Sequence, residues 1–252
     1  PNTWRITRPL SRYKKEHGKE EIWIFGGSFT HGWCLNDEAT YPWRLQKRFP
    51  QYKIVNYGVE GYGTVHSLLQ MRQALARKTP KAVVLAYAHF HDERNTFLRH
   101  RRKQIAPWCK LGRLVQPYAR LNNEGKLVIK MAEVEYREFP LMRYLSLAHY
   151  VEQIYNHVED RFHNSQAVTQ ALIGSMADIA KKHKIPFILA GIDHGEAMMD
   201  YAKTHGIPHV DISVNLRRPY YNNSPHDLHP SAAANQVYAQ KLGDFLEKEI
   251  LP

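Results

Sequence analysis

The sequence predicts an α/β fold, a flavodoxin-like three-layer sandwich in which a five-stranded parallel sheet lies between helices on both faces. Two observations support this prediction. Short, uninterrupted apolar runs alternate with stretches of helical apolar spacing, which is typical of parallel strands buried on both faces. The 252 residues are 43% hydrophobic and 23% charged, as expected for a globular protein large enough to bury a sizeable core.

We expect one domain over residues 1–252, with an extended polar leader over residues 1–20. The expected strands are EIWIFG (21–26), KIVNYG (53–58), KAVVLAY (81–87), IPFILAGI (185–192) and IPHVDIS (207–213). Spaced apolar residues predict helices over residues 39–50, 64–78, 166–183, 195–205 and 231–249.

Residues 94–165 interrupt this alternation, and we interpret them as an insertion on the parallel scaffold. The polar NNEG segment (122–125) predicts the turn of a hairpin between two strands. The segment over residues 141–162 has the apolar spacing of a helix. Because insertions near a site often carry specificity, we expect this region to shape the substrate groove.

The chain is basic, with a formal net charge of +11 and a pI near 9.6. Much of the excess charge lies in RHRRK (99–103), KK (14–15) and the stretch from Lys110 to Arg120. RHRRK is flanked by Leu98 and Ile105 and therefore predicts a solvated helix face. Since no zinc-finger spacing or aromatic RNA-binding motif accompanies it, we expect no specific nucleic-acid partner. Association with an anionic envelope surface is a possible use of the charge, and the oligomeric state is open.

The termini and cysteines bear on the cellular compartment. The chain begins at Pro1, so we expect that an N-terminal signal or anchor has been removed, which slightly favours an extracytoplasmic location over the cytoplasm. Cys34 and Cys109 could pair in an oxidising compartment or remain separate thiols, and both alternatives stay open.

Unusual residues follow the ends of the predicted strands. The first strand is followed by Gly26, Gly27 and Ser28, and the second by the glycine-rich NYGVEGYGT. The third is followed by HFHD (89–92), and the loop before the last helix contains SPHDLHPS (224–231). Because ligands bind outside the carboxyl ends of parallel strands, these loops place a hydroxyl, glycine amides, imidazoles and a carboxylate at one edge. Those groups are what acyl transfer requires.

Four segments together resemble the SGNH or GDSL family of hydrolases, named for Ser, Gly, Asn and His in four sequence blocks. The matching segments are GGSFTHG (26–32), NYGVEGYGT (56–64), AYAHFHDE (86–93) and HDLHPSAAAN (226–235), in the family's order. GGSFTHGWCLNDEATYP is similar to GDSFTxGxGVxDxxTYP in bacterial GDSL-type esterases and acyl hydrolases. Gly27 replaces the usual aspartate of the first block, and His91 replaces the usual asparagine of the third.

The resemblance implies a role for each matching residue. Ser28 is the expected nucleophile, His229 the base that accepts its proton, and Asp227 the acid that orients the imidazole. The Ser28 and Gly61 amides, with the His91 side chain, are the expected oxyanion hole. Further polar residues are candidates for a substrate pocket: His31, His89, Asp92 and His226.

The resulting hypothesis is a serine ester hydrolase that removes a short, acetyl-like group from a carbohydrate or cell-envelope substrate, without a metal or other cofactor. Three alternatives remain: an O-acyltransferase that uses the same residues, a metal-dependent hydrolase, and a non-catalytic glycan- or nucleic-acid-binding protein on a degenerate hydrolase scaffold. The metal alternative would draw on five residues: His89, His91, Asp92, His226 and His229.

Overall fold

The computed structural model describes residues 5–9 and 18–251. Contacts divide the chain into two units, the first formed by residues 1–62, 67–89 and 174–252, the second by 63–66 and 90–173. Most of the expected leader, residues 1–4 and 10–17, lies outside the described residues. Within it, Arg5 donates hydrogen bonds to Asp37 and to the Gly32 carbonyl, at 2.7 and 2.6 Å. The single-domain assignment stays a prediction.

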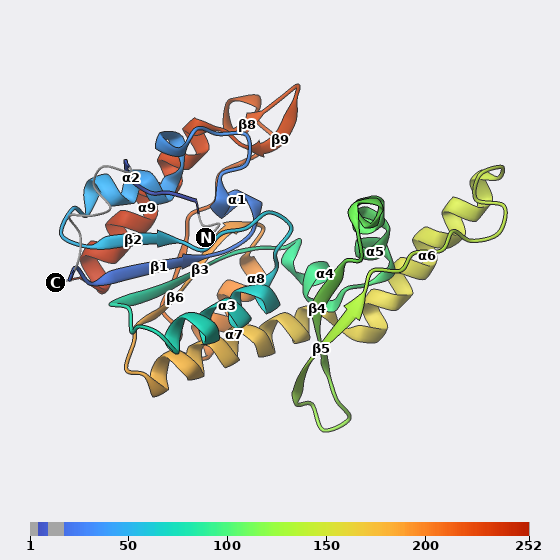
Figure 1. The fold of residues 1–252 in the computed structure, drawn as a ribbon, viewed down its shortest axis with the longest axis horizontal. Coiled ribbons are helices and arrows are strands. Elements are labelled where there is room, and N and C mark those ends of the chain that lie inside the picture. Colours follow the sequence, from blue (N-terminus) through green and yellow to red (C-terminus); the bar gives the residue numbers. More distant parts are fainter. Residues whose placement is uncertain (1–4, 10–17, 252) are drawn as a thin grey trace. The chain divides into compact units, whose positions relative to one another are not determined.

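The first unit contains a five-stranded parallel sheet in the order β2-β1-β3-β6-β7, which confirms the predicted fold class (Figure 1). In sequence order this is 2-1-3-4-5, the flavodoxin-like arrangement. The strands are β1 (Glu21–Phe25), β2 (Lys53–Asn56), β3 (Ala82–Ala88), β6 (Phe187–Asp193) and β7 (His209–Asp211).

Burial explains why these runs form strands. Every residue of β1, β3 and β6 is buried, so alternation between polar and apolar positions is absent. Ile22, Ile24 and Phe25 have no exposed surface, and covering each such side chain stabilises the fold by about 1.5–3 kcal/mol.

Helices cover both faces of the sheet: α2 and α9 lie on one face, and α3 and α7 on the other (Figure 1). The helices that contribute to this unit are α1 (Ser28–His31), α2 (Tyr41–Arg48), α3 (Thr64–Leu75), α7 (Ser165–Lys182), α8 (Glu196–Thr204) and α9 (Ala232–Glu249). The unit also has two 3-10 turns, η2 (Asp37–Ala39) and η4 (Pro219–Tyr221), and a short hairpin of β8 (Asn222–Asn223) and β9 (Asp227–Pro230). Two of the four boundaries between the units fall within α3 and α7, and the other two follow Tyr62 and His89.

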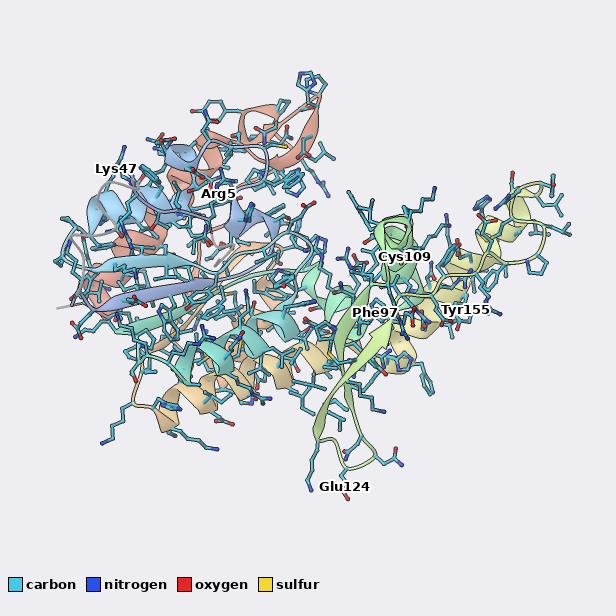
Figure 2. All side chains as sticks on the ribbon, in the orientation of Figure 1. Arg5, Lys47, Phe97, Cys109, Glu124 and Tyr155 are labelled. Atoms are coloured by element: carbon cyan, nitrogen blue, oxygen red, sulfur yellow. The ribbon has the colours of Figure 1, made fainter. Side chains whose placement is uncertain are left out.

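The second unit contains the predicted hairpin and helix. Its elements are α4 (His91–Thr96), α5 (Arg99–Ile105), the 3-10 turn η3 (Ala106–Leu111), β4 (Val115–Leu121), β5 (Leu127–Glu133), α6 (Ser146–His163) and the first half of α7. β4 pairs with β5 in antiparallel register, and Gly125 in their turn has a φ of +73°, which favours glycine. A small core forms around Phe97, Ile105 and Val134 (Phe97 is labelled in Figure 2).

Two details differ from the sequence prediction. The helix expected from residue 141 begins at Ser146, because Leu141 has a φ of +62° and residues 140–144 form a turn. The RHRRK segment forms α5, but its Arg99 side chain is only 13% exposed and pairs with Glu152. Both cysteines are free thiols. Among the described residues, no helix has the length and apolar run needed to cross a membrane.

Candidate active site

A tight turn at the end of β1 positions Ser28. Gly26 leaves no room for a side chain, because an added Cβ would lie 2.2 Å from Oγ1 of Thr30. The Gly27 carbonyl accepts hydrogen bonds from the amides of Thr30 and His31, at 3.1 and 2.9 Å. The turn is therefore well bonded although glycine replaces the aspartate of the usual block. Ser28 is the first residue of α1 and does not cap it, since Gly27 occupies the N-cap position.

The structure brings Ser28, His229 and Asp227 into one series of hydrogen bonds. Nε2 of His229 lies 3.0 Å from Oγ of Ser28, a residue 201 positions earlier in the chain. Nδ1 of the same ring lies 2.6 Å from Oδ1 of Asp227. A ring that is held on one side by a carboxylate presents its other nitrogen to the hydroxyl, which is the geometry of a serine nucleophile with its general base.

The β8–β9 hairpin supplies both the carboxylate and the imidazole of this series. Asp227 and His229 are two residues apart on β9, so their side chains project from the same face of the strand. Oδ1 of Asp227 also accepts the backbone amide of His229 at 2.5 Å, and Asn223 donates to the His229 carbonyl at 3.2 Å. The Asp-x-His spacing therefore forms the pair within one short strand.

The electrostatics favour a charged Asp227. Partial desolvation opposes ionisation, but hydrogen bonds from the backbone and ring of His229 outweigh it and hold the pKa of Asp227 below its usual value. The neighbouring Cys34 thiol lowers the pKa of this carboxylate further. Loss of hydration and the neighbouring Asp227 raise the pKa of Cys34, so this exposed cysteine is held as the neutral thiol.

Two aromatic side chains flank the imidazole, and sequence reasoning did not find them. The Phe29 ring packs edge-on to His229 at a centroid distance of 5.6 Å, and the Trp33 ring lies 6.5 Å away. Trp33 remains 39% exposed. Phe29 lies in α1 and Trp33 in the loop that follows it, so aromatic residues in and directly after the first block are the signal that could have identified them.

Comparison with known proteins gives a family for this fold and site. The model of the GDSL-like lipase/acylhydrolase family matches residues 24–237, which contain the Ser28 turn and the β9 pair. The chain belongs to this family. No curated protein matches the chain.

Solved structures show the same fold for this GDSL-like protein. A putative lipolytic protein of the G-D-S-L family from Desulfitobacterium hafniense DCB-2 is 15% identical, with a TM-score of 0.51; the match covers 90% of this chain and 100% of that one. A putative acylhydrolase from Bacteroides fragilis NCTC 9343 is 18% identical, also with a TM-score of 0.51, and the match covers 96% and 97% of the two chains. At these identities the similarity shows the fold alone.

The second family block is bonded to the Ser28 turn. The side chain of Asn56 donates to the Thr30 carbonyl at 2.9 Å and accepts the Gly58 amide at 2.8 Å. Gly58 must be glycine, because a Cβ would lie 2.6 Å from the amide nitrogen of His31. Gly61 follows with a φ of +76° in the same loop. The role of its amide in an oxyanion hole stays a prediction.

The histidine assigned to the substrate pocket beside Ser28 also bonds to this loop. Nδ1 of His31 lies 3.2 Å from the Gly58 carbonyl, and burial lowers the pKa of His31. This contact makes His31 part of the support of the turn.

The residues of the third block divide between the two units. His89 belongs to the first unit, where its Nδ1 lies 3.2 Å from Oδ2 of Asp193 at the end of β6. His91 and Asp92 begin α4 in the second unit. His91 is buried there, with Nδ1 3.3 Å from Oγ1 of Thr64. Its assignment as an oxyanion donor, like that of Asp92 to the pocket, stays a prediction.

Within the described parts of the chain, no three side chains of the His, Cys, Asp or Glu type are grouped so that they could hold a metal ion. His229 is instead bonded to Ser28 and Asp227, and His226 is exposed on the turn of the β8–β9 hairpin.

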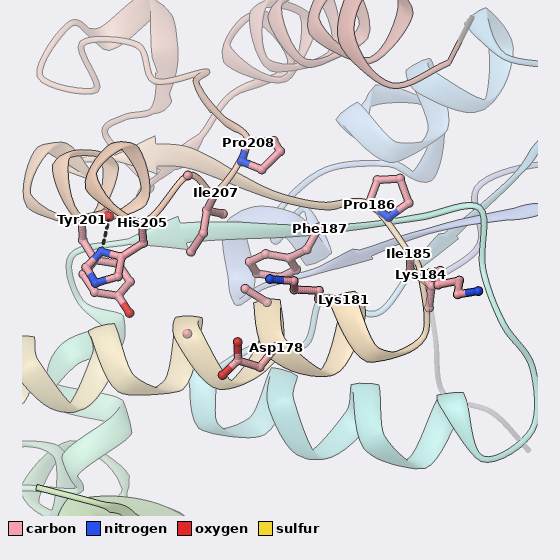
Figure 3. Close-up of a pocket in the computed structure, with 13 residues that line it drawn as sticks. Asp178, Lys181, Lys184, Ile185, Pro186, Phe187, Tyr201, His205, Ile207 and Pro208 are labelled. Carbon is pink, nitrogen blue, oxygen red and sulfur yellow. Dashed lines mark hydrogen bonds between the residues drawn. The ribbon is translucent and has the colours of Figure 1, made fainter.

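A hollow of about 650 Å³ lies at the opposite end of the first unit's sheet (Figure 3). It is lined by α7, the start of β6 and α8, and Phe187 at its wall is the first residue of β6. Ser28, in contrast, follows the last residues of β1. The polar lining of this hollow includes Asp178, Tyr201 and His205, and Nδ1 of His205 lies 2.8 Å from the backbone carbonyl of Tyr201. The hydroxyl–imidazole–carboxylate series described above lies instead at the Ser28 turn.

Proposed function

We propose that this GDSL-like acylhydrolase is a serine ester hydrolase whose nucleophile is Ser28. The observation that carries the proposal is the hydrogen-bond series from Ser28 through His229 to Asp227, with distances of 3.0 and 2.6 Å. A serine hydroxyl is a poor nucleophile without a base, and His229 is in position to act as that base.

The proposed reaction has two halves. Oγ of Ser28 attacks the ester carbonyl carbon while its proton moves to Nε2 of His229, and the Ser28 and Gly61 amides hold the tetrahedral oxyanion. His229 then returns the proton to the leaving alcohol, which departs and leaves an acyl-serine. Water attacks that ester with His229 again as base, and the carboxylic acid and free Ser28 result. Asp227 stabilises the imidazolium in both halves.

We further propose a short acyl group, such as acetyl, on a carbohydrate or cell-envelope substrate. The half-exposed Trp33 beside His229 supports this proposal, because it offers a flat apolar surface for a sugar ring next to the nucleophile. The net charge of +11 is suited to an anionic envelope polymer.

Activity of the native protein and of Ser28→Ala on 4-nitrophenyl acetate, butyrate and octanoate tests the nucleophile and the acyl length. Ser146→Ala, an exposed serine in the second unit, is the matched control. We expect loss of turnover only in Ser28→Ala, with the acetyl ester preferred. Equal rates for the native protein and Ser28→Ala would refute the nucleophile. Labelling by a fluorophosphonate probe, and acetate release from acetylated polysaccharides, complete the test.

A further inference from the structure

Helix α6 of the second unit turns its apolar side outward. Seven large apolar side chains on this helix are between 45% and 82% exposed: Leu147, Tyr150, Val151, Ile154, Tyr155, Val158 and Phe162. We call these seven residues the α6 face (Tyr155 is labelled in Figure 2). Monomeric proteins rarely expose so many contiguous apolar side chains without a use for them.

Ion pairs on the inner side of α6 fix this orientation. The Glu152 side chain is 4% exposed and bonds to Nε of Arg99 at 3.1 Å, to the Tyr136 hydroxyl at 2.7 Å, and to Lys103. Glu159 lies about two helical turns after Glu152. It accepts a hydrogen bond from the Arg99 backbone amide at 2.7 Å and pairs with Arg102 at 3.1 Å. Rotating α6 to bury its apolar side would leave Glu152 and its cations without partners, at a cost of several kcal/mol.

The spacing of the α6 face fits a second helix. Leu147, Val151, Ile154 and Val158 follow one another at intervals of four, three and four residues. This is the a/d pattern of a helix pair, with Val151 and Val158 at a positions and Leu147 and Ile154 at d positions, and it ends at Arg161, the next d position. The three aromatic residues of the face flank this seam, as is common at protein interfaces.

The α6 face is also self-complementary in charge and sufficient in area. None of its seven side chains is charged at neutral pH, so two copies related by a two-fold axis meet without charged members of the face opposing each other. Each side chain still has roughly 100 Å² of accessible surface to bury, because a fully covered aromatic side chain buries about 150–250 Å² and these side chains are between 45% and 82% exposed. Two copies of the face would then bury roughly 1,400 Å², within the usual range for a stable interface.

We infer that the α6 face joins two copies of this chain in a symmetric dimer through a helix–helix contact. A membrane surface fits less well. Helices that lie on membranes are rich in Lys and Arg on their polar side, whereas α6 carries Glu152, Glu159 and Asp160 against a single Arg161. The inference is independent of the proposed hydrolase activity.

Sedimentation equilibrium of the full chain over a wide concentration range tests the dimer. Ile154→Glu places a charge at the centre of the α6 face, and Gln153→Glu adds the same charge at an exposed neighbouring position on the polar side. We expect the native protein and Gln153→Glu to dimerise alike. Ile154→Glu should weaken dimerisation by about 30-fold or more, the effect of losing a central interface residue.

Circular dichroism and thermal unfolding of dilute protein provide the folding check, because an exposed residue should be replaceable without loss of the monomer's stability. A native protein that is monomeric throughout, or a dimer that Ile154→Glu leaves intact, would overturn the inference. Monomers that float with phosphatidylcholine or phosphatidylglycerol vesicles, and lose this property in Ile154→Glu, would assign the α6 face to a membrane and overturn it as well.

Discussion

Replacing Asp227 with asparagine tests the proposed acid–base pair most directly. The change keeps the size of the side chain and removes its charge. In the native protein Oδ1 of Asp227 accepts both Nδ1 and the backbone amide of His229, at 2.6 and 2.5 Å. An asparagine oxygen can still accept one of these bonds, so we expect the free energy of unfolding to change by only about 1 kcal/mol.

The expected loss of activity follows from the missing charge. Two unit charges about 4 Å apart interact by about 4 kcal/mol at the effective dielectric constant of a protein surface, which corresponds to roughly 10³-fold in rate. The asparagine amide can also select the wrong imidazole tautomer, and in another serine triad this substitution lowers kcat about 10⁴-fold. Since the Asp227 and His229 side chains are 23% and 27% exposed, we expect kcat/KM to fall by about 10³-fold.

The assay is hydrolysis of 4-nitrophenyl acetate, with active sites counted by a fluorophosphonate probe. Asp244→Asn is the control, because this exposed carboxylate makes the same type of charged contact with Arg48, on the surface of α9. Its activity should remain that of the native protein. If Asp227→Asn stays within about tenfold of the native kcat/KM, Asp227 does not support His229 in the way described.

Three further predictions follow from other contacts. Gly26→Ala should lower the free energy of unfolding by about 1–3 kcal/mol, because its Cβ would meet Thr30 at 2.2 Å; an unchanged urea midpoint would contradict this. Trp33→Ala should raise KM about fivefold to tenfold for an acetylated glycan and much less for 4-nitrophenyl acetate; equal effects on both substrates would contradict a role in binding the sugar. Desolvation lowers the pKa of His66 in the folded protein to about 4, whereas an unperturbed histidine titrates near about 6.5. Between these two pH values only the unfolded chain binds the proton, so the free energy of unfolding should fall by up to about 3 kcal/mol as pH drops from about 6.5 to about 4. Urea unfolding of His66→Gln, which can still bond to Gln116, should show a smaller pH dependence, and an unchanged dependence would assign it to other groups.

The strands could be predicted because their signal is local. An apolar run such as IWIF that ends at Gly26 is typical of a central strand buried on both faces, and the structure forms β1 there. The helix at residue 141 was predicted too early, because apolar spacing continues through a turn in which Leu141 adopts a φ of +62°. Periodicity does not report such backbone angles.

The candidate site could be predicted only in part, for a similar reason. Ser28, Asp227 and His229 belong to sequence blocks, whereas the contacts of Trp33 and Cys34 with the β9 pair depend on the path of the loop after α1. The orientation of α6 could not be predicted from the sequence either. Its amphipathic pattern predicts a helix, but the side that faces inward is decided by Arg99, which lies 53 residues before Glu152.

Asp227 and His229 lie two positions apart on β9, so the short hairpin carries the carboxylate and the imidazole together as one structural unit. Its internal geometry depends on strand pleating and on one short hairpin, and long-range folding has to set only where that hairpin docks against the nucleophile turn. A displacement of the hairpin would carry both groups away from Ser28 together. A protein molecule with a displaced hairpin would therefore lose its proposed hydrolase activity completely, and partly active conformations would be few.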